Sequence, residues 1–288
     1  MLQVKEILNR FLHELVFRNY FIAMCAVSMV FTTYLLIGIP VHVTHFTIFL
    51  ACATFLLYNF HIYSFHLDYS NIGEFFASFN ALNVKIYEQI VFVFVLLIAA
   101  INLFYLNEYV LLWFIPLAIF SLLYSMPLVG IKRKFRIRES LFVKMPLLAS
   151  VWSLATVIIP LAEQNIQLNS PLIVQQVICR FFFVFALCIP FEIRDLEVDK
   201  KENVKTLPLV FGVNKTRILG LILIVAEIVI HHYMPISPAG IFALDLSSVI
   251  ALGWIFVKTR KRESYFYKLF VDGTMVLRFL FLYIAYYI

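Results

Sequence analysis

Charge is scarce in this sequence, and several long stretches carry almost none. Asp, Glu, Lys and Arg make up 14% of the 288 residues, whereas 63% are hydrophobic. A soluble domain is closer to half apolar and a quarter charged, so this composition excludes an ordinary soluble protein. The net charge of +6 comes from basic residues confined to a few short segments. No broad basic surface results, and we expect no nucleic-acid partner.

Cysteine is also sparse. The four cysteines (Cys25, Cys52, Cys179 and Cys188) all lie inside apolar stretches, without a CxxC pair or a Cys/His spacing typical of a metal site. Free Cys in such surroundings behaves as a small buried hydrophobe. We therefore expect packing residues, not disulfides or zinc ligands.

The uncharged windows have the length of about 20 residues that is needed to cross a bilayer. They predict an all-α fold: one domain over 1–288, a polytopic bundle of nine transmembrane helices with loops that cap its cytoplasmic end. No cleavable signal peptide is evident. Residues 1–16 instead show helical apolar spacing, which predicts an amphipathic helix on the membrane surface. The expected spans are 18–38, 42–60, 89–106, 109–127, 143–161, 172–191, 216–234, 239–257 and 270–287.

The positions of Lys and Arg predict the orientation of the bundle. Of the 23 basic residues, all but Arg180 and Arg278 lie in the N-terminal segment, in the loops after spans two, four, six and eight, or within the first two residues of the span that follows such a segment. The positive-inside rule then predicts a cytoplasmic N-terminus and an outside C-terminus. We expect a bacterial inner membrane protein. The long inside loops 61–88 and 192–215 predict a functional face on the cytoplasmic side.

An acidic segment follows the sixth expected span. If this segment is helical, Glu192, Asp195 and Asp199 lie within an arc of about 60°, because successive residues turn by about 100°. Crowded carboxylates repel one another unless a cation lies between them. Oxygen ligands of this kind favour Mg²⁺, which often shares its shell with phosphates. The alternative is a solvated helix neutralised by Lys200 and Lys201.

Two further polar clusters are expected at the same end of the bundle. One is the segment 58–68, which follows span two and includes the pair His61 and His66, either acid/base groups or pocket lining. The other, 124–144, is strongly basic. Carboxylates that hold a cation beside Lys and Arg form a diphosphate-binding arrangement. The apolar bundle beneath would suit a long hydrocarbon tail.

These segments resemble those of the UbiA superfamily of intramembrane prenyltransferases. The family's second aspartate-rich motif, D-x-x-D-x-x-x-D, is matched from Glu192 to Asp199, with Glu in place of the first Asp. The K-[ST]-x-P stretch after it is matched from Lys205 to Pro208, ending at Gly212. The stretch from Tyr124 to Lys132 and Arg133 resembles the family's basic element after helix four. The resemblance covers nearly the whole chain.

The first aspartate-rich motif departs from the family pattern. Asn59 is present, but Phe60, Tyr63 and Leu67 occupy the expected acidic positions, and Asp68 comes one residue late. The resemblance supports one metal site better than a second. It implies these roles: Asp195 and Asp199 as catalytic residues; Glu192, Asp195, Asp199 and Asp68 as Mg²⁺ ligands; Asn59, Tyr63, Tyr124, Lys132, Arg133 and Lys205 as substrate-binding residues.

The implied function is transfer of a prenyl group from a polyprenyl diphosphate to an acceptor, which we expect to be aromatic, as in isoprenoid quinone biosynthesis. The alternative is a catalytically impaired or non-catalytic membrane protein that binds prenyl diphosphate or lipid on the same fold. The acceptor, the prenyl chain length and the oligomeric state are left open by the sequence.

Three charged residues fall at membrane depth, where a charge is costly and is usually paired or faces a cavity. They are Arg180, Glu227 and Arg278. We expect Arg180, about 18 Å along the helix axis from Glu192, to pair with Glu227 or with another acid in the bundle. Asp272, at the cytoplasmic start of the last span, is a further candidate for the mouth of the site.

Overall fold

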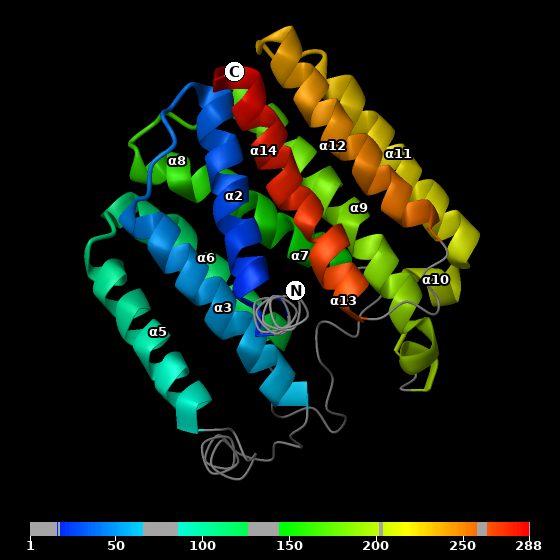
Figure 1. Ribbon diagram of the computed structural model, residues 1–288, viewed down its shortest axis with the longest axis horizontal. Coiled ribbons are helices and arrows are strands. Elements are labelled where there is room, and N and C mark those ends of the chain that lie inside the picture. The colour runs from blue at the N-terminus through cyan, green and yellow to red at the C-terminus, as the bar shows by residue number, and fades with distance from the viewer. Residues whose placement is uncertain are drawn as a thin grey trace, which may run out of the picture. The chain divides into compact units, whose positions relative to one another are not determined.

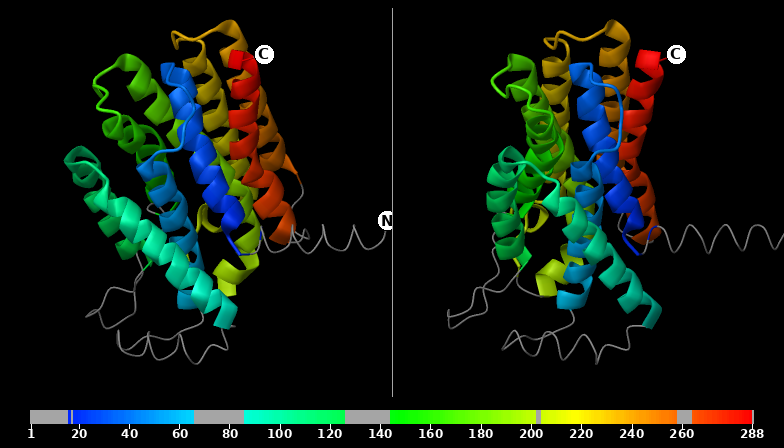
Figure 2. Two further views of the ribbon diagram at one scale, coloured as in Figure 1. Left: turned by 60° about the vertical axis from the view of Figure 1, so that its left-hand side comes forward. Right: turned by 90° about the vertical axis from the view of Figure 1, so that its left-hand side faces the viewer.

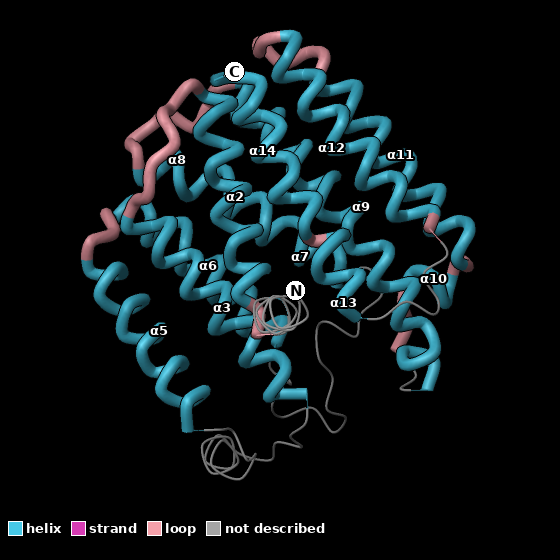
Figure 3. The backbone as a smooth tube through the Cα atoms, in the orientation of Figure 1, coloured by secondary structure: helices cyan, strands magenta, loops and turns pink. Residues whose placement is uncertain are grey.

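A computed structural model describes residues 16, 18–65, 86–125, 144–201, 204–257 and 264–287, with the backbone only at 60–65, 86, 88, 120–125 and 264. Every regular element in these residues is helical (Figure 3). The helices are α2 (Tyr20–Ile37), α3 (His45–Phe65), α5 (Ile86–Phe104), α6 (Glu108–Ser125), α7 (Lys144–Ser153), α8 (Ile159–Glu163), α9 (Pro171–Lys201), α10 (Leu207–Val210), α11 (Val213–His231), α12 (Pro238–Phe256), α13 (Ser264–Phe266) and α14 (Gly273–Tyr287). Two π-helical segments are inserted, η2 (Leu154–Ile158) after α7 and η3 (Tyr267–Val271) before α14.

Each expected span coincides with helix in the described part of the chain, so the all-helical prediction is confirmed. Five helical stretches are long and apolar enough to cross a membrane: Tyr20–Ile37, Lys144–Glu163, Pro171–Lys201, Pro238–Phe256 and Tyr267–Tyr287. Nine crossings, the cytoplasmic position of the cap loops and the single domain stay predictions. The expected surface helix at 1–16 lies outside the described residues, apart from Val16.

The chain divides into two compact units, and the first comprises Met1–Met24 and Val43–Leu106. Within it, α3 packs along α5. The start of α3 is joined to the end of α5 by His45, whose Nδ1 lies 2.9 Å from Asn102 Oδ1 and whose ring stacks on Tyr105. Large apolar side chains of α5, among them Phe94 and Phe104, are exposed. An exposed apolar surface of this kind is typical of contact with lipid.

The second unit comprises Cys25–His42 and Asn107–Ile288. Here α9 packs against α7, α11 and α12, and α12 also packs against α11 and α14. Helices α11, α12 and α14 run alongside one another (Figures 1 and 2). On α11, the exposed residues Ile218, Ile222, Val225 and Val229 recur every three or four positions. This spacing places them on one face, and the polar residues Glu227 and His231 of the same helix are buried in the interior.

Gly220 lets α11 approach its neighbours closely. A Cβ at this position would lie 2.8 Å from Cδ1 of Ile189 on α9 and 2.9 Å from Cδ1 of Ile255 on α12. We expect Gly220→Leu to lower the free energy of unfolding by about 1–3 kcal/mol, the usual cost of overpacking. Thermal unfolding in one detergent would measure it. The control is Gly253→Leu on α12, where a Cβ meets nothing within 4 Å. Equal effects of the two substitutions would contradict close packing at Gly220.

Candidate functional site

The acidic segment after the sixth expected span is helical, which is the condition on which the expected shared face depends. Helix α9 continues without a break through Glu192, Asp195 and Asp199 to Lys201. Lys200 and Lys201 occupy its last turn. Positive charge is favourable there, because the C-terminal end of a helix carries a partial negative charge. Glu192 and Asp199 are buried, whereas Glu197, which points elsewhere around the helix, is exposed. The carboxylates expected on one face of α9 therefore share that face.

Glu192 is held by a lysine from another helix. Its Oε1 lies 2.6 Å from Nζ of Lys144, the first residue of α7. The Glu192 side chain is 6% exposed, so the pair compensates a charge that burial would otherwise make costly. The resemblance to the family predicts Glu192 as a metal ligand. In the structure the partner is Lys144.

Asp195 is engaged by its neighbour along the chain. Arg194 donates from Nε to Asp195 Oδ1 at 2.6 Å and from Nη2 to Oδ2 at 2.8 Å, a bidentate pair. The same guanidinium lies 4.9 Å from the ring centroid of Tyr267 and 5.2 Å from that of Phe191. These distances are within cation–π range. The Asp195 side chain is 37% exposed, so it stays accessible to a ligand.

The π-helical segment η3 brings Tyr267 to this end of α9. Tyr267 is fully buried, and η3 packs against α9. Asp272 follows η3, and its carbonyl oxygen accepts a bond from Cys25 Sγ at 3.4 Å. A π-helix inserted in an α-helix often marks a functional site, because it displaces backbone and side chains from the regular register. Asp272 thus follows a segment that packs against α9, the helix with the acidic residues.

The described chain resumes at residue 204 and forms the short helix α10 (Leu207–Val210). Lys205 is exposed and Thr206 is buried, just before α10. Gly212 precedes α11 with φ +85°, a conformation that favours glycine. The hydroxyl of Thr216 donates to the Gly212 carbonyl at 3.0 Å. The glycine of the sequence motif therefore has a structural reason, and the assignment of Lys205 to substrate binding stays a prediction.

Asn59 of the first motif fastens the end of α3 to the chain before α2, within the first unit. Its Nδ2 donates to the carbonyls of Phe55 at 2.8 Å and Arg18 at 3.3 Å, and its Oδ1 accepts from Asn19 Nδ2 at 3.2 Å. Asn59 is thus a hydrogen-bonding residue inside α3, which continues to Phe65. A substrate contact by Asn59 stays a prediction.

Other predicted site residues lie where the structure gives no side chain. The backbone of Tyr63 belongs to α3 and that of Tyr124 to α6, but their side chains are outside the described part. Asp68, Lys132 and Arg133, like His66, lie outside the described residues altogether. Among the residues that are described, no three His, Cys, Asp or Glu side chains converge as a metal site. The assignment of Asp195 and Asp199 as metal ligands stays a prediction.

Sequence reasoning placed Lys144 only among the basic residues of the loop before it, and it missed Tyr267. A signal for Lys144 exists. The fifth and sixth expected spans are antiparallel neighbours, so the start of one and the end of the next lie at the same depth. A lysine at the first position and a glutamate at the second are therefore natural partners. Nothing comparable marks Tyr267, whose position depends on the π-helical register of η3.

Comparison with known proteins identifies the fold. The sequence profile of the UbiA prenyltransferase family matches residues 79–271. No match was found among curated proteins. A solved structure of a UbiA homolog from Archaeoglobus fulgidus has a TM-score of 0.59 and 14% identity, covering 94% of this chain and 98% of that one. The same homolog bound to GPP and Mg²⁺ has a TM-score of 0.57 and 14% identity, covering 96% and 99%.

The structural likeness at 14% identity shows a shared fold, and the profile adds a match in sequence. That match includes the motif from Glu192 to Asp199 and its K-[ST]-x-P extension. Because the profile extends over most of the sequence, this chain belongs to the UbiA prenyltransferase family.

Proposed function

We propose that the protein is an integral membrane prenyltransferase that transfers a prenyl group from a polyprenyl diphosphate to an aromatic acceptor. The observation that carries the proposal is the acidic face at the end of α9, in a chain of this family. Structures of the archaeal homolog with GPP and Mg²⁺ and with DMAPP and Mg²⁺ support a prenyl diphosphate as the ligand. Isoprenoid quinone biosynthesis would use such a reaction, and a bacterial inner membrane with a cytoplasmic N-terminus fits the charge distribution.

The residues of the acidic face fit Mg²⁺. This ion binds through one or two carboxylates, retains several waters and completes its shell with substrate phosphates. Asp199 and Asp195 lie one helical turn apart on α9 and would supply these carboxylates, with Asp68 as the proposed contribution of the first motif. When bound, Mg²⁺ offsets the negative charge that builds on the departing diphosphate.

The basic residues of the chain would hold the diphosphate. Lys144 and Arg194 already lie against the acidic face, at Glu192 and Asp195. Lys205 is exposed just beyond α9, and we propose that Lys132, Arg133, Tyr124, Tyr63 and Asn59 complete the substrate contacts. Prenyl transfer passes through an allylic carbocation that water would consume, so the apolar helices must also exclude water from the reacting carbon.

The test uses the full chain in lipid nanodiscs with labelled prenyl diphosphates of several lengths and a panel of aromatic acceptors. We expect a prenylated acceptor and free diphosphate with Mg²⁺, and no product when EDTA replaces it. The negative control is the same assay with nanodiscs that contain no protein. Hydrolysis alone, without transfer to any acceptor, would contradict the proposed reaction.

A second function has specific support. Glu192 is paired with Lys144 and Asp195 with Arg194. The first motif has no acidic residue at the positions where the family pattern expects one. These features suit a protein that binds a prenyl diphosphate without turning it over. Saturable, Mg²⁺-dependent binding of labelled prenyl diphosphate, with no product across the acceptors tested, would favour this binder over the transferase.

A further inference from the structure

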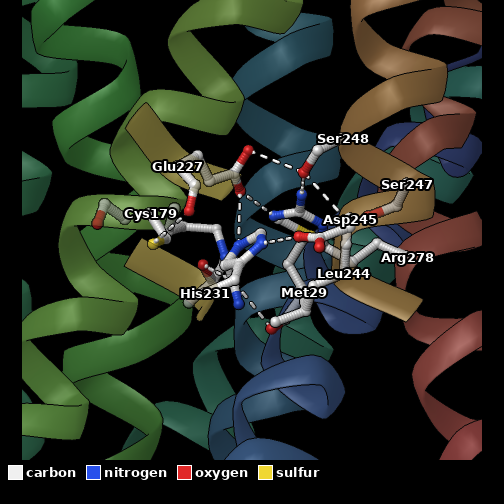
Figure 4. A network of polar contacts seen from close by, with 12 residues as sticks. Met29, Cys179, Glu227, His231, Leu244, Asp245, Ser247, Ser248 and Arg278 are labelled. Atoms are coloured by element: carbon white, nitrogen blue, oxygen red, sulfur yellow. Dashed lines mark hydrogen bonds and ion pairs between the residues drawn. The ribbon is translucent and has the colours of Figure 1, made fainter. Parts of the chain in front are cut away.

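A polar network lies inside the second unit, away from the acidic face, and Arg278 of α14 is at its centre (Figure 4). Arg278 donates from Nη1 to Glu227 Oε1 at 2.6 Å, from Nε to Ser247 Oγ at 2.8 Å and from Nη2 to Ser248 Oγ at 2.7 Å. Its guanidinium also lies 3.4 Å from the ring centroid of Phe183. Each guanidinium nitrogen therefore has a partner in α11 or α12, and the charge is balanced by Glu227.

A second buried arginine has its own set of partners. Arg180 of α9 donates from Nη1 to the Met29 carbonyl at 2.9 Å and to Thr156 Oγ1 at 2.6 Å, and from Nη2 to Thr33 Oγ1 at 3.2 Å. The Thr33 hydroxyl donates in turn to the Thr156 carbonyl at 2.7 Å. Thr156 lies in η2, where the π-helical register leaves its carbonyl available. Arg180 thus joins α2, η2 and α9 through neutral partners.

His231 links the first network to the surface. Its Nδ1 lies 2.8 Å from Asp245 Oδ1, and its Nε2 lies 3.5 Å from Glu227 Oε1. His231 is buried, whereas the Asp245 side chain is 22% exposed. The polar groups therefore extend from the surface of α12 to the interior position of Arg278.

Both arginines and His231 line one small cavity of about 10 Å³. The remaining lining comes from Thr32, Leu36, Gln176, Cys179, Met234 and Leu244. Gln176 is 2% exposed, and neither its Nε2 nor its Oε1 has a hydrogen-bond partner among the described residues. A buried amide without partners is costly. The cavity beside Gln176 is the place from which a partner would come.

The size and the chemistry of the cavity identify the occupant. A volume of 10 Å³ is about the space of one water molecule. The unpartnered groups of Gln176 are an NH₂ group that donates and a carbonyl oxygen that accepts, so a ligand that satisfies both must itself accept and donate. A cation would leave Nε2 without a partner, and an anion would leave Oε1 without one. The guanidinium groups nearby already donate to protein oxygens.

We propose that this cavity is a binding site for a single structural water, which hydrogen-bonds to Gln176 and lies between the Arg180 and Arg278 networks. The water supplies the missing partners of the Gln176 amide. It also connects two groups of helices, α2 and η2 on the Arg180 side and α11, α12 and α14 on the Arg278 side. This site is independent of the proposed enzymatic activity.

Radiolytic footprinting tests the proposal directly, because X-ray irradiation converts a bound water to hydroxyl radical, which oxidises adjacent sulfur. In the full chain in nanodiscs, we expect Met234 and Cys179 to be oxidised severalfold faster than Met275 and Cys25. The latter two are buried to a similar degree and do not line the cavity. Equal rates within each matched pair would overturn the proposal.

The variant Gln176→Leu provides the second readout. It removes the amide that anchors the water, so oxidation of Met234 should fall to the rate of Met275 and the Tm should decrease. If the cavity were dry, the same substitution would remove an unsatisfied amide and raise the Tm, which would overturn the proposal. A Tm that depends on chloride in the wild type and not in Gln176→Leu would identify an anion instead, and would also overturn it.

Discussion

Asp199→Ala is expected to lower the rate of prenyl transfer by on the order of 10²-fold or more, the usual loss when one charge-stabilising group is removed from an active site. Asp199 is buried on the acidic face of α9, one helical turn from Asp195, where it would contribute a carboxylate to Mg²⁺. The measurement is the initial rate of product formation at saturating Mg²⁺ in nanodiscs. Asp195→Ala is a less direct test, since it also releases Arg194 from a bidentate pair.

The matched control is Glu197→Ala, an exposed carboxylate on another face of the same helical turns. It should leave the rate within about twofold of wild type, since exposed charges contribute little. Glu192→Gln should lose less activity than Asp199→Ala, because an amide still accepts a bond from Lys144. If Glu197→Ala and Asp199→Ala were equally active, the acidic face would have no role in catalysis.

The sequence predicts the helices well because the bilayer imposes a length. Uncharged windows of about 20 residues allow few alternatives to a spanning helix, and each expected span coincides with helix. The sequence predicted that Glu192, Asp195 and Asp199 share one face if their segment is helical, and the segment is helical. The spacing of the three carboxylates was sufficient for this, because a helix relates spacing to direction without any knowledge of the neighbours.

The partners of buried charges were predicted less well. The expected pairing of Arg180 with Glu227 is wrong, since Glu227 pairs with Arg278 and Arg180 binds Thr33, Thr156 and the Met29 carbonyl. Hydropathy predicts how deep a residue lies in the membrane. Arg180 and Arg278 are expected at similar depths, so either could pair with Glu227. The choice between them depends on how each helix is rotated about its axis and on which helices are adjacent. These are properties of packing that a single sequence does not contain.

Arg278→Leu is expected to lower the free energy of unfolding by about 3–5 kcal/mol, the cost of breaking a buried ion pair from one side. The substitution leaves the fully buried Glu227 without its cation, and Ser247 and Ser248 lose their donor. Reversible unfolding of the full chain in one detergent or lipid system would measure the change. Arg278→Lys, which retains the charge but not the three-way fork, should fall between wild type and Arg278→Leu.

The double variant Glu227→Met with Arg278→Leu decides whether the loss comes from the unpaired charge. Replacing both partners by apolar residues removes the desolvated carboxylate together with its cation, and such replacements are often neutral or stabilising. We therefore expect the double variant to recover most of the stability that Arg278→Leu loses, in spite of the second substitution. His231 and the two serines would still have Asp245 and the Leu244 carbonyl as partners. A double variant as unstable as the sum of the two single variants would instead mean that Arg278 stabilises the fold by packing on Phe183, not by compensating Glu227.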